Sequence, residues 1–329
     1  MKKFNLKTAI QCVVLVCALT ISSQVSMAGN LEPNAPPAST MKPLDQVEPR
    51  IAITTLPFTI LASGSYYLVS DLTASGGNGI TVDANNVTID LCGFSLIGYN
   101  GNGYGVYMLG RSNVEIRNGT IRNFYTGIYE GSTNGFGDRV IGVRAISNTD
   151  SGIYLLGKGN EVRGCTVSYN GISASGSSIY GIFANNGSTV TGNTVSNNAT
   201  LSTTGFFGII TGTGSTITGN TVNNNGTSLA GVWFDGLSGG TGCTITGNTV
   251  SNNGNSATGS YTIYGLDAGA GSTVIGNTVN SNGISATGGT LYGIYLEGHN
   301  LVDQNTAYNN NGTNMNNPGN CTFGQNYAP

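Results

Sequence analysis

The stretch STITGNTVNNNG, from Ser215 to Gly226, decides the fold because it recurs almost unchanged three more times. The other copies are STVTGNTVSNN from Ser188, CTITGNTVSNNG from Cys243 and STVIGNTVNSNG from Ser272. Each copy is uncharged and carries a single aliphatic residue every few positions among Asn, Thr and Gly. Because these three residue types are poor in helix interiors, the repeat excludes stacked helices and indicates short strands separated by bends.

Two markers give the period of the repeat. The first is a Gly followed by an aliphatic residue, found at Gly79-Ile80, Gly105-Val106, Gly127-Ile128, Gly152-Ile153, Gly181-Ile182, Gly208-Ile209, Gly231-Val232, Gly265-Leu266 and Gly293-Ile294. The second is a Thr, found at Thr166, Thr194, Thr221, Thr249, Thr278 and Thr306, with spacings of 28, 27, 28, 29 and 28 residues. A period in this range is typical of a solenoid, whose units wind once around and stack as parallel strands.

Stacking of such units places like residues on like. We therefore expect an internal column made of Val167, Val195, Val222, Val250 and Val279. At the bend we expect an amide ladder made of Asn193, Asn220, Asn248, Asn277 and Asn305. Asn side chains can bond to their own copies above and below, whereas like charges in the same positions would repel one another.

With these repeats, the chain resembles the right-handed parallel β-helix family, the pectin-lyase-like superfold of bacterial secreted repeat proteins, from about Ile51 to Tyr308. The resemblance implies an all-β, right-handed parallel β-helix of about nine coils. The right-handed winding agrees with the rule that connections between parallel strands are right-handed. It also implies an N-terminal cap at residues 50–76, which include PFTILASGSYYLVSDL, and a C-terminal cap at residues 309–329. Caps are expected because open parallel edges recruit other chains.

The N-terminus has the pattern of a secretory signal. Lys2, Lys3 and Lys7 precede an apolar run from Thr8 to Ile21, and small residues at Ser26 and Ala28 predict cleavage after Ala28. Residues 29–49 hold five of the eight prolines and form a predicted linker, so residues 50–329 are the β-helix domain. We expect an exported monomer with no membrane span, which is secreted, periplasmic or on the cell surface.

The remaining cysteines and the insertions follow from the same register. Cys92, Cys165, Cys243 and Cys321 fall in well-separated coils, so we expect free thiols.

The distance from the repeated Val to the next Gly grows in the later coils, through segments such as NGISASGSSIY, NATLSTTGFF, NSATGSYTIY and NGISATGGTLY. These insertions are expected to leave one corner in five successive coils, where they either wall a binding groove or are merely tolerated.

Three carboxylates are candidate catalytic residues. Counted from the Gly marker, Asp235 and Glu297 are at +4 and Asp267 is at +2, so all three are expected on one outer face of consecutive coils. A separation of roughly 8 Å would suit an inverting acid and base pair. Aromatic and imidazole side chains on the same face are predicted to bind substrate: Trp233, Tyr295, Phe183, Tyr154 and His299. The alternative is that the acids supply solubility and the aromatic residues only stack.

Earlier in the chain, cations and acids are mixed. The members are Arg117, Arg122, Arg139, Arg144, Arg163, Glu115, Glu130, Asp138, Asp150 and Glu161. These residues could serve as the cations and the base of a polyuronate lyase. We favour the alternative that they form salt bridges between coils. The superfold's galacturonan hydrolases use NTD, DD, GHG and RIK motifs. This chain has NTD at Asn148 to Asp150 and GHN at Gly298 to Asn300, and lacks DD and RIK, so that activity is not carried over.

Three functional classes remain open. Residues Thr189 and Thr191, with their copies in the next two coils, form a T-x-T pattern that resembles ice-binding solenoids. A net charge of −3 with 8% charged residues gives no basic excess for nucleic acid, and we expect neither a metal nor another cofactor. The leading hypothesis is an exported β-helix that binds a polysaccharide or cell-surface glycan. If it is an enzyme, it cleaves this ligand as a lyase or a glycosidase. The alternative is a non-catalytic adhesive or structural solenoid, and ice binding is the remote one.

Overall fold

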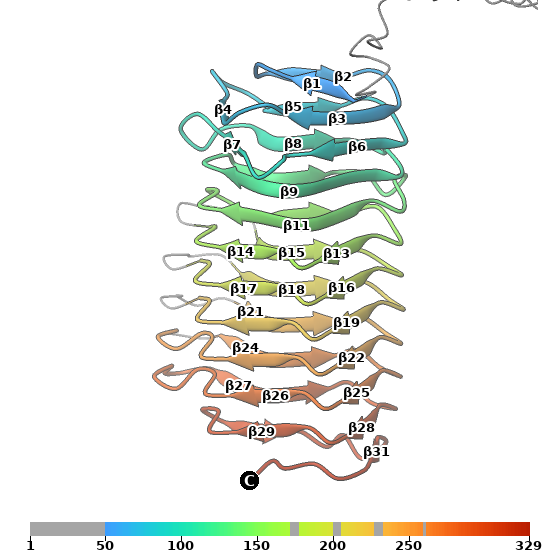
Figure 1. The fold of residues 1–329 in the computed structure, drawn as a ribbon. Helices are drawn as coiled ribbons and strands as arrows, with labels where there is room; N and C mark the ends of the chain where they lie inside the picture. The colour runs from blue at the N-terminus through green and yellow to red at the C-terminus, as the bar shows by residue number, and fades with distance from the viewer. Residues whose placement is uncertain (1–49, 172–177, 200–204, 227–232, 259–260) are drawn as a thin grey trace, which may run out of the picture. The chain divides into compact units, whose positions relative to one another are not determined.

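The computed structural model describes residues 50–171, 178–199, 205–226, 233–258 and 261–329. In these residues the chain forms two parallel sheets, and Figure 1 shows them stacked coil upon coil from β1 to β31. The 11-stranded sheet comprises β2 (Phe58–Ile60), β5 (Ile80–Val82), β8 (Tyr104–Met108), β10 (Thr126–Glu130), β12 (Ile153–Leu155), β15 (Ile179–Ala184), β18 (Phe206–Thr211), β21 (Trp233–Gly239), β24 (Thr262–Ala268), β27 (Thr290–Leu296) and β30 (Thr313–Met315).

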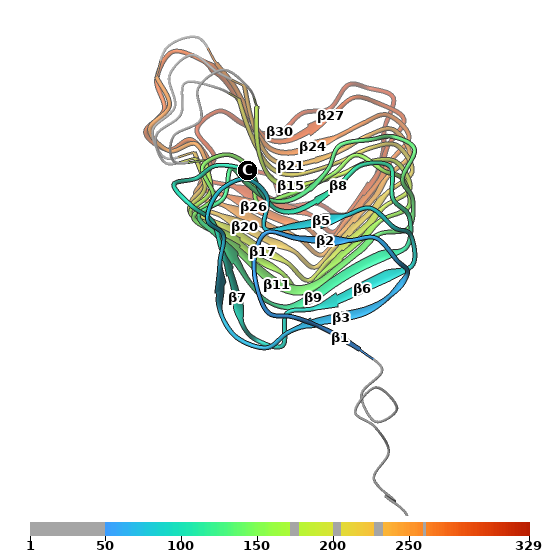
Figure 2. The same cartoon turned by 90° about the horizontal axis from the view of Figure 1, so that it is seen from above.

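The second sheet has 20 strands in the described residues and forms the other sides of each coil, as the view along the stack shows (Figure 2). Its strands are β1 (Ile51–Ile53), β3 (Gly64–Leu68), β4 (Leu72–Thr73), β6 (Val87–Asp90), β7 (Ser95–Ile97), β9 (Val114–Arg122), β11 (Arg139–Ile146), β13 (Glu161–Arg163), β14 (Thr166–Ser168), β16 (Thr189–Thr191), β17 (Thr194–Ser196), β19 (Thr216–Thr218), β20 (Thr221–Asn223), β22 (Thr244–Thr246), β23 (Thr249–Ser251), β25 (Thr273–Ile275), β26 (Thr278–Asn280), β28 (Leu301–Asp303), β29 (Thr306–Tyr308) and β31 (Thr322–Phe323).

The predicted valine column is confirmed. The five valines are paired in one continuous register and are fully buried: Val167, Val195, Val222, Val250 and Val279. The column ends on Ala307, which pairs with the last of them. A single apolar core therefore runs along the stack, because each coil buries its inward side chains against those of its neighbours.

The predicted amide ladder is also confirmed. Between successive members, from Asn193 to Asn305, the Nδ2 of each side chain donates to the Oδ1 of the next at 2.9–3.0 Å. Each Nδ2 also donates to a backbone carbonyl, as Asn220 does to Val190 at 2.9 Å. The glycine before each Asn from Asn193 to Asn277 has a left-handed φ of 62–67°, a conformation that glycine adopts without a steric penalty, and Gln304 before Asn305 has a φ of 55°. The GN pair is therefore the corner of the coil.

A second amide ladder lies at the corner where the 20-stranded sheet leads into the 11-stranded sheet. Its seven members are all buried: Asn148, Asn170, Asn198, Asn225, Asn253, Asn282 and Asn310. Neighbouring members are joined by amide–amide bonds of 2.9–3.0 Å. The sequence signal is an Asn three residues after the inward column residue of each coil, as Asn198 follows Val195.

One marker of the predicted repeat was wrong. Gly231 and Val232 lie outside the described residues, and the repeat position in that coil is Gly236-Leu237, since Leu237 pairs with Ile209 and with Leu266. The glycine spacings then become 28, 29 and 28 residues from Gly208 to Gly293. The corrected markers lie on nine strands of the 11-stranded sheet, from β5 to β27, and this agrees with about nine coils.

The segments expected to be caps carry parallel strands of their own. β2 pairs with β5 and β3 pairs with β6, within residues 50–76 and the next coil. At the other end, β30 pairs with β27 and β31 pairs with β28. The predicted signal and linker, residues 1–49, lie outside the described residues. Among the described residues, no helix is long and apolar enough to cross a membrane.

The expected free thiols are confirmed for Cys92, Cys165, Cys243 and Cys321. Cys165 and Cys243 are buried, whereas Cys92 is exposed. The T-x-T rows are in register too, with Thr189, Thr216 and Thr244 forming one column on the outer face of the 20-stranded sheet. Ice binding by this surface stays a prediction.

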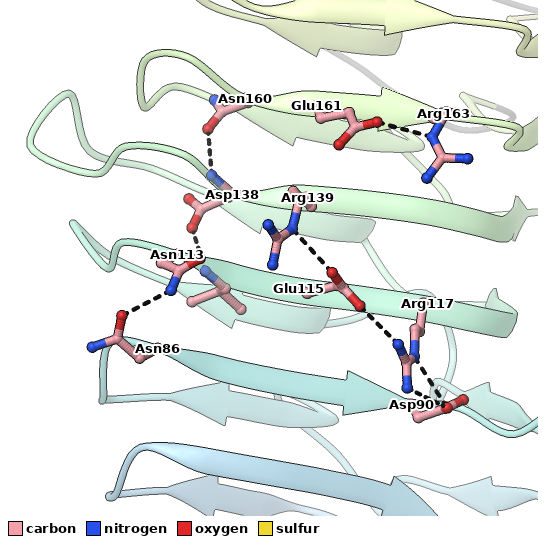
Figure 3. A network of polar contacts seen from close by, with 11 residues as sticks. Asn86, Asp90, Asn113, Glu115, Arg117, Asp138, Arg139, Asn160, Glu161 and Arg163 are labelled. Atoms are coloured by element: carbon pink, nitrogen blue, oxygen red, sulfur yellow. Dashed lines mark hydrogen bonds and ion pairs between the residues drawn. The ribbon is translucent and has the colours of Figure 1, made fainter.

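The mixed charges between β6 and β13 form ion pairs, as expected (Figure 3). Arg117 contacts Asp90 and Glu115, each at 3.1 Å, and Arg139 contacts Glu115 at 3.0 Å. A further pair joins Arg163 and Glu161 at 2.9 Å. Because these pairs are partly exposed, each contributes at most about 1 kcal/mol.

Three acids expected in that network are buried elsewhere, which corrects the prediction. Glu130 accepts hydrogen bonds from the backbone amides of Gly110 and Ser132, both at 3.0 Å, and of Gly157. Asp138 accepts from the backbone amide of Val114 at 2.9 Å. Asp150 lies at the outer face of the 11-stranded sheet and is described below. The first two carboxylates satisfy turns, because a buried amide without a partner is costly.

We expect Asn248→Ala to lower the free energy of unfolding by about 2 kcal/mol or more, since it removes an amide with four bonds from a buried ladder. Asn248 donates to Ile217 and Asn277, and it accepts from the backbone and the side chain of Asn220. Chemical denaturation measures the change. The control is Thr249→Ala at the adjacent exposed residue, which should cost less than about 1 kcal/mol. Equal losses in the two variants would contradict a stabilising role for the ladder.

We predict that the buried carboxyl group of Asp138 makes the folded protein less stable as the pH rises. Burial raises its pKa from 3.8 to about 7, so between about pH 4 and pH 7 the unfolded chain releases this proton while the folded chain keeps it. Its contribution to stability is therefore complete below pH 4 and is lost as the pH approaches 7. Asp138→Asn should flatten that part of the stability profile, measured by denaturation at several pH values. An unaltered slope in Asp138→Asn would refute the assignment.

Candidate functional site

The outer face of the 11-stranded sheet carries two columns of side chains, which we call the aromatic face. In β15, β18, β24 and β27, outward residues lie directly before the inward glycine and two positions after it. The first column contains Tyr180, Phe207, Asp235, Tyr264 and Tyr292. The second contains Tyr107, Tyr129, Tyr154, Phe183, Ile210, Ser238, Asp267 and Tyr295.

The aromatic rings of this face stack on one another from coil to coil. The ring centroids of Tyr129 and Tyr154 are 5.3 Å apart, and those of Tyr154 and Phe183 are 4.7 Å apart, with nearly parallel planes. Farther along, the rings of Tyr264 and Tyr295 stack at 4.5 Å. Parallel stacking is the arrangement that successive coils impose, and it leaves ring edges and hydroxyl groups directed outward.

A cavity of about 350 Å³ opens in the aromatic face over β8 to β15. Its lining consists of aromatic rings, hydroxyl groups and one carboxyl group: Tyr104, Tyr125, Thr126, Tyr129, Asp150, Ser151, Tyr154, Ser178 and Tyr180. The volume is at the lower end of the range for small-molecule sites, and it is sufficient for one sugar ring.

Asp150 supplies the carboxyl group of this cavity and is 8% exposed. Burial raises its pKa, although nearby hydroxyl groups, chiefly that of Ser151, oppose the shift. The Ser151 hydroxyl donates to Asp150 Oδ2 at 2.8 Å and accepts from the backbone amide of Tyr180 at 3.0 Å. A titratable group with a shifted pKa in a cavity is a candidate functional group.

The candidate acids Asp235 and Asp267 come together farther along the same face. Asp235 is 2% exposed, and burial followed by the charge of Asp267 raises its pKa well above 3.8. Burial also raises the pKa of Asp267 to about 6, and the charge of Glu297 adds to this shift. Ser238 Oγ donates to Asp267 Oδ2 at 3.2 Å, while Oδ1 is buried without a partner. Two carboxyl groups on one face with raised pKa values are candidates for an acid and a base.

The offset between these two acids differs from the prediction. Asp235 pairs with Tyr264, so Asp267 lies one coil and three residues away instead of one coil and two. On an ideal sheet this places the Cα atoms about 11 Å apart, instead of roughly 8 Å. The error follows from the wrong Gly231 marker, since Asp235 directly precedes the true marker, Gly236.

Trp233 is also displaced from its expected column. It pairs with Thr262 at the start of β21, and not in the column of Tyr154, Phe183 and Tyr295. Its ring is 51% exposed, and its Nε1 donates to Asp235 Oδ1 at 2.8 Å. The Trp233 and Tyr264 rings meet edge to face at 5.7 Å beside the buried carboxyl group. Burial raises the pKa of Tyr264 to about 12, with the charges of Tyr295, Asp267 and Asp235 adding to the shift.

Glu297 and His299 follow β27, at the far end of the strand from Tyr292. Glu297 is exposed, and its Oε2 accepts from the backbone amide of Ala270 at 3.3 Å. His299 is exposed, with its Nε2 3.4 Å from Asn320 Nδ2. Glu297 therefore acts on the acid pair through its charge, whereas His299 is held in a turn beyond it.

The insertions leave one corner of the coil, beside the start of the strands of the 11-stranded sheet (Figure 2). Residues 172–177, 200–204, 227–232 and 259–260 of these segments lie outside the described residues. The described parts are joined coil to coil by backbone bonds, as Gly254 to Asn225 and Gly283 to Asn253 show. They enclose a small apolar cluster: Ile179, Ala199, Phe206, Phe234, Ala257, Tyr261, Ile263, Ala286 and Leu291.

The match to a family model decides the family. The model described as the right-handed beta helix region matches residues 59–225. The chain belongs to the right-handed β-helix family. This confirms the predicted fold class, including its hand. No curated protein matches the sequence of this β-helix.

Two solved structures show the same fold at low identity. One is the Azotobacter vinelandii mannuronan C-5 epimerase AlgE6 A-module, with a TM-score of 0.54 and 12% identity over 85% of this β-helix chain and 89% of that one. The other is the AlgE4 A-module of the same organism, with a TM-score of 0.56 and 13% identity over 84% and 83% of the two chains. At such identities the likeness concerns the fold alone.

Sequence reasoning missed most of the cavity. It had assigned Asp150 to the ion-pair cluster and overlooked Tyr104, Tyr125, Tyr129 and Tyr180. The available signal was the tyrosine near the glycine marker in consecutive coils, which places several rings on one outer face. Among the described residues, no group of three or more His, Cys, Asp or Glu side chains is arranged to hold a metal ion.

Proposed function

We propose that this β-helix binds an extended polysaccharide along its aromatic face, with one sugar residue in the Asp150 cavity. The observation that carries the proposal is the cavity itself, which combines stacked tyrosine rings with hydroxyl groups and a buried carboxyl group. The outward ring edges and hydroxyl groups of the tyrosines, together with the other polar groups of the lining, can contact a sugar and orient its hydroxyl groups.

The face also has the shape that a polymer needs. The outward columns continue from Tyr107 to Tyr295, on strands stacked about 4.8 Å apart. The described parts of the insertions are joined from coil to coil along the same direction. The mannuronan epimerase A-modules, whose names specify a polysaccharide substrate, share this fold, and this supports a polymeric sugar ligand without specifying it.

Tyr154→Ala should weaken polysaccharide binding at least about tenfold, or ~1.4 kcal/mol, because it removes a ring from the cavity lining. The measurement is affinity electrophoresis or calorimetry with a polymer identified by screening plant, algal and bacterial polysaccharides. The matched control is Tyr308→Ala on the 20-stranded sheet, where the ring is also partly exposed. Binding that is equally weakened in both variants, or in neither, would remove the cavity from the proposal.

A second candidate function is cleavage of the bound chain by Asp235 and Asp267. The observation that favours it is the position of two buried carboxyl groups on neighbouring strands of one face, where burial raises the pKa of both. Asp235, whose pKa burial raises well above 3.8, would in its protonated form donate a proton to the glycosidic oxygen as that bond breaks. Asp267, ionised above about pH 6, would accept a proton from the water that attacks the anomeric carbon. Glu297, the third predicted catalytic acid, would act through its charge, which raises the pKa of Asp267.

Asp267→Asn should abolish the release of reducing ends while circular dichroism and polymer binding stay unchanged. In the parent chain, the rate should rise as the pH increases through about 6, where the base ionises, and should fall when Asp235 loses its proton. Reducing-end and unsaturated-uronate assays measure the activity, and Asp83→Asn is the control. Binding without turnover in the parent chain would favour the non-catalytic solenoid, and unsaturated products would favour a lyase.

A further inference from the structure

We infer that the polysaccharide bound on the aromatic face is neutral and not a polyuronate, an inference that rests on the proposed function. It concerns the charge of the ligand, and it comes from where the structure places every described cation and every acid of the face.

The ionised or ionisable groups of the aromatic face are acidic. Asp150 lies in the cavity, Asp235 and Asp267 lie farther along, and Glu297 lies at the edge. Within the described part of the chain, the two outward columns and the cavity lining contain no Lys, Arg or His.

The cations that the structure describes lie elsewhere. Five arginines are on β9, β11 and β13 of the 20-stranded sheet: Arg117, Arg122, Arg139, Arg144 and Arg163. Arg50 directly precedes β1 of the same sheet. Arg111 and Lys158 follow β8 and β12, at the opposite end of those strands from the cavity residues Tyr104 and Asp150. Arg111 is also engaged by Asp83 at 2.9 Å.

The sequence extends this argument to the insertion wall. No Lys or Arg follows Arg163, so none of the later insertions can place one beside the face, including those parts that lie outside the described residues. Four of the insertion segments border β18 to β27, where Asp235 and Asp267 lie. These insertions therefore add no lysine or arginine to the face.

A polyuronate carries one carboxylate on each sugar and would face carboxyl groups across a partly dehydrated surface, where repulsion is screened less than in water. Recognition of anionic sugars relies on Arg or Lys, which can pair with a carboxylate. The uncharged hydroxyl groups of Ser178 and of the tyrosines in the cavity lining instead match the hydroxyl groups of a neutral sugar. The charge pattern therefore discriminates against a polyuronate more strongly than it selects one neutral sugar.

The test compares polymers that differ only in charge: polygalacturonate with its fully methyl-esterified form, and alginate with its carboxyl-reduced form. The protein is the full chain, and binding is measured by calorimetry at about 20 mM and 300 mM salt. We expect the neutral member of at least one pair to bind at least about tenfold more tightly at low salt, and the difference to shrink at high salt.

A charge-insertion variant isolates the electrostatic cause. Ser178→Lys places a cation at the half-buried rim of the cavity and should raise the affinity for the anionic member by about tenfold. Thr194→Lys makes the same change on the exposed face of the 20-stranded sheet and should have no such effect.

Each outcome decides a different claim. An anionic polymer that binds the parent chain as tightly as its neutral form, or more tightly, overturns neutrality and leaves polysaccharide binding intact. No binding to any polymer, in these pairs or in the wider screen, overturns the proposed function and the inference with it. A gain in both Lys variants, or in neither, would show that charge on this face does not control selectivity.

Discussion

The fold depends on one constraint, which is that nearly every inward or corner residue must lie on a copy of itself. A valine satisfies this by packing on a valine, and the column from Val167 to Val279 does so without interruption. Asparagine satisfies it because its amide is both donor and acceptor, so each member of a ladder can donate in one direction and accept from the other. A charged side chain could not occupy such a column without repelling its copies. This is the physical reason for the low charge content of the later coils.

The constraint is weaker on the outer surfaces, and the two sheets use that freedom differently. On the 20-stranded sheet the outward positions still repeat, as Thr194, Thr221 and Thr249 do. On the aromatic face the repetition ends, since one column passes from Phe183 to Ile210, Ser238, Asp267 and Tyr295. Stacking does not require these changes. Departure from a repeat where nothing structural demands it is what we expect of a surface that binds a ligand.

Much of the fold could be predicted from the sequence because its contacts join equivalent residues about 28 apart, and periodicity alone locates them. The valine column and the amide ladder from Asn193 to Asn305 follow directly. Prediction failed where an insertion interrupts the count. Gly231 and Val232 imitate the marker, and they displaced Trp233 and Asp235 from their true columns. The tyrosine pattern could have indicated one aromatic face, but not the shape of the cavity, because its lining joins residues of four coils and includes Ser178, which lies beyond an insertion.

The buried acids show how the solenoid separates structural from chemical uses of the same side chain. Asp138 and Asp235 both have pKa values raised chiefly by burial. Asp138 lies at a corner. Asn160 in the next coil is uncharged, and its Oδ1 accepts a hydrogen bond from the backbone amide of Asp138. An amide side chain could therefore replace the carboxyl group of Asp138. Asp235 lies on the outer face beside a half-exposed indole that donates to it, where nothing in the stacking calls for a carboxyl group. Keeping a second acid, Asp267, near it costs stability through desolvation and repulsion. Since the stacked core and its ladders do not depend on either group, the solenoid can tolerate that cost, and the acid pair is better explained by chemistry at the surface than by the fold.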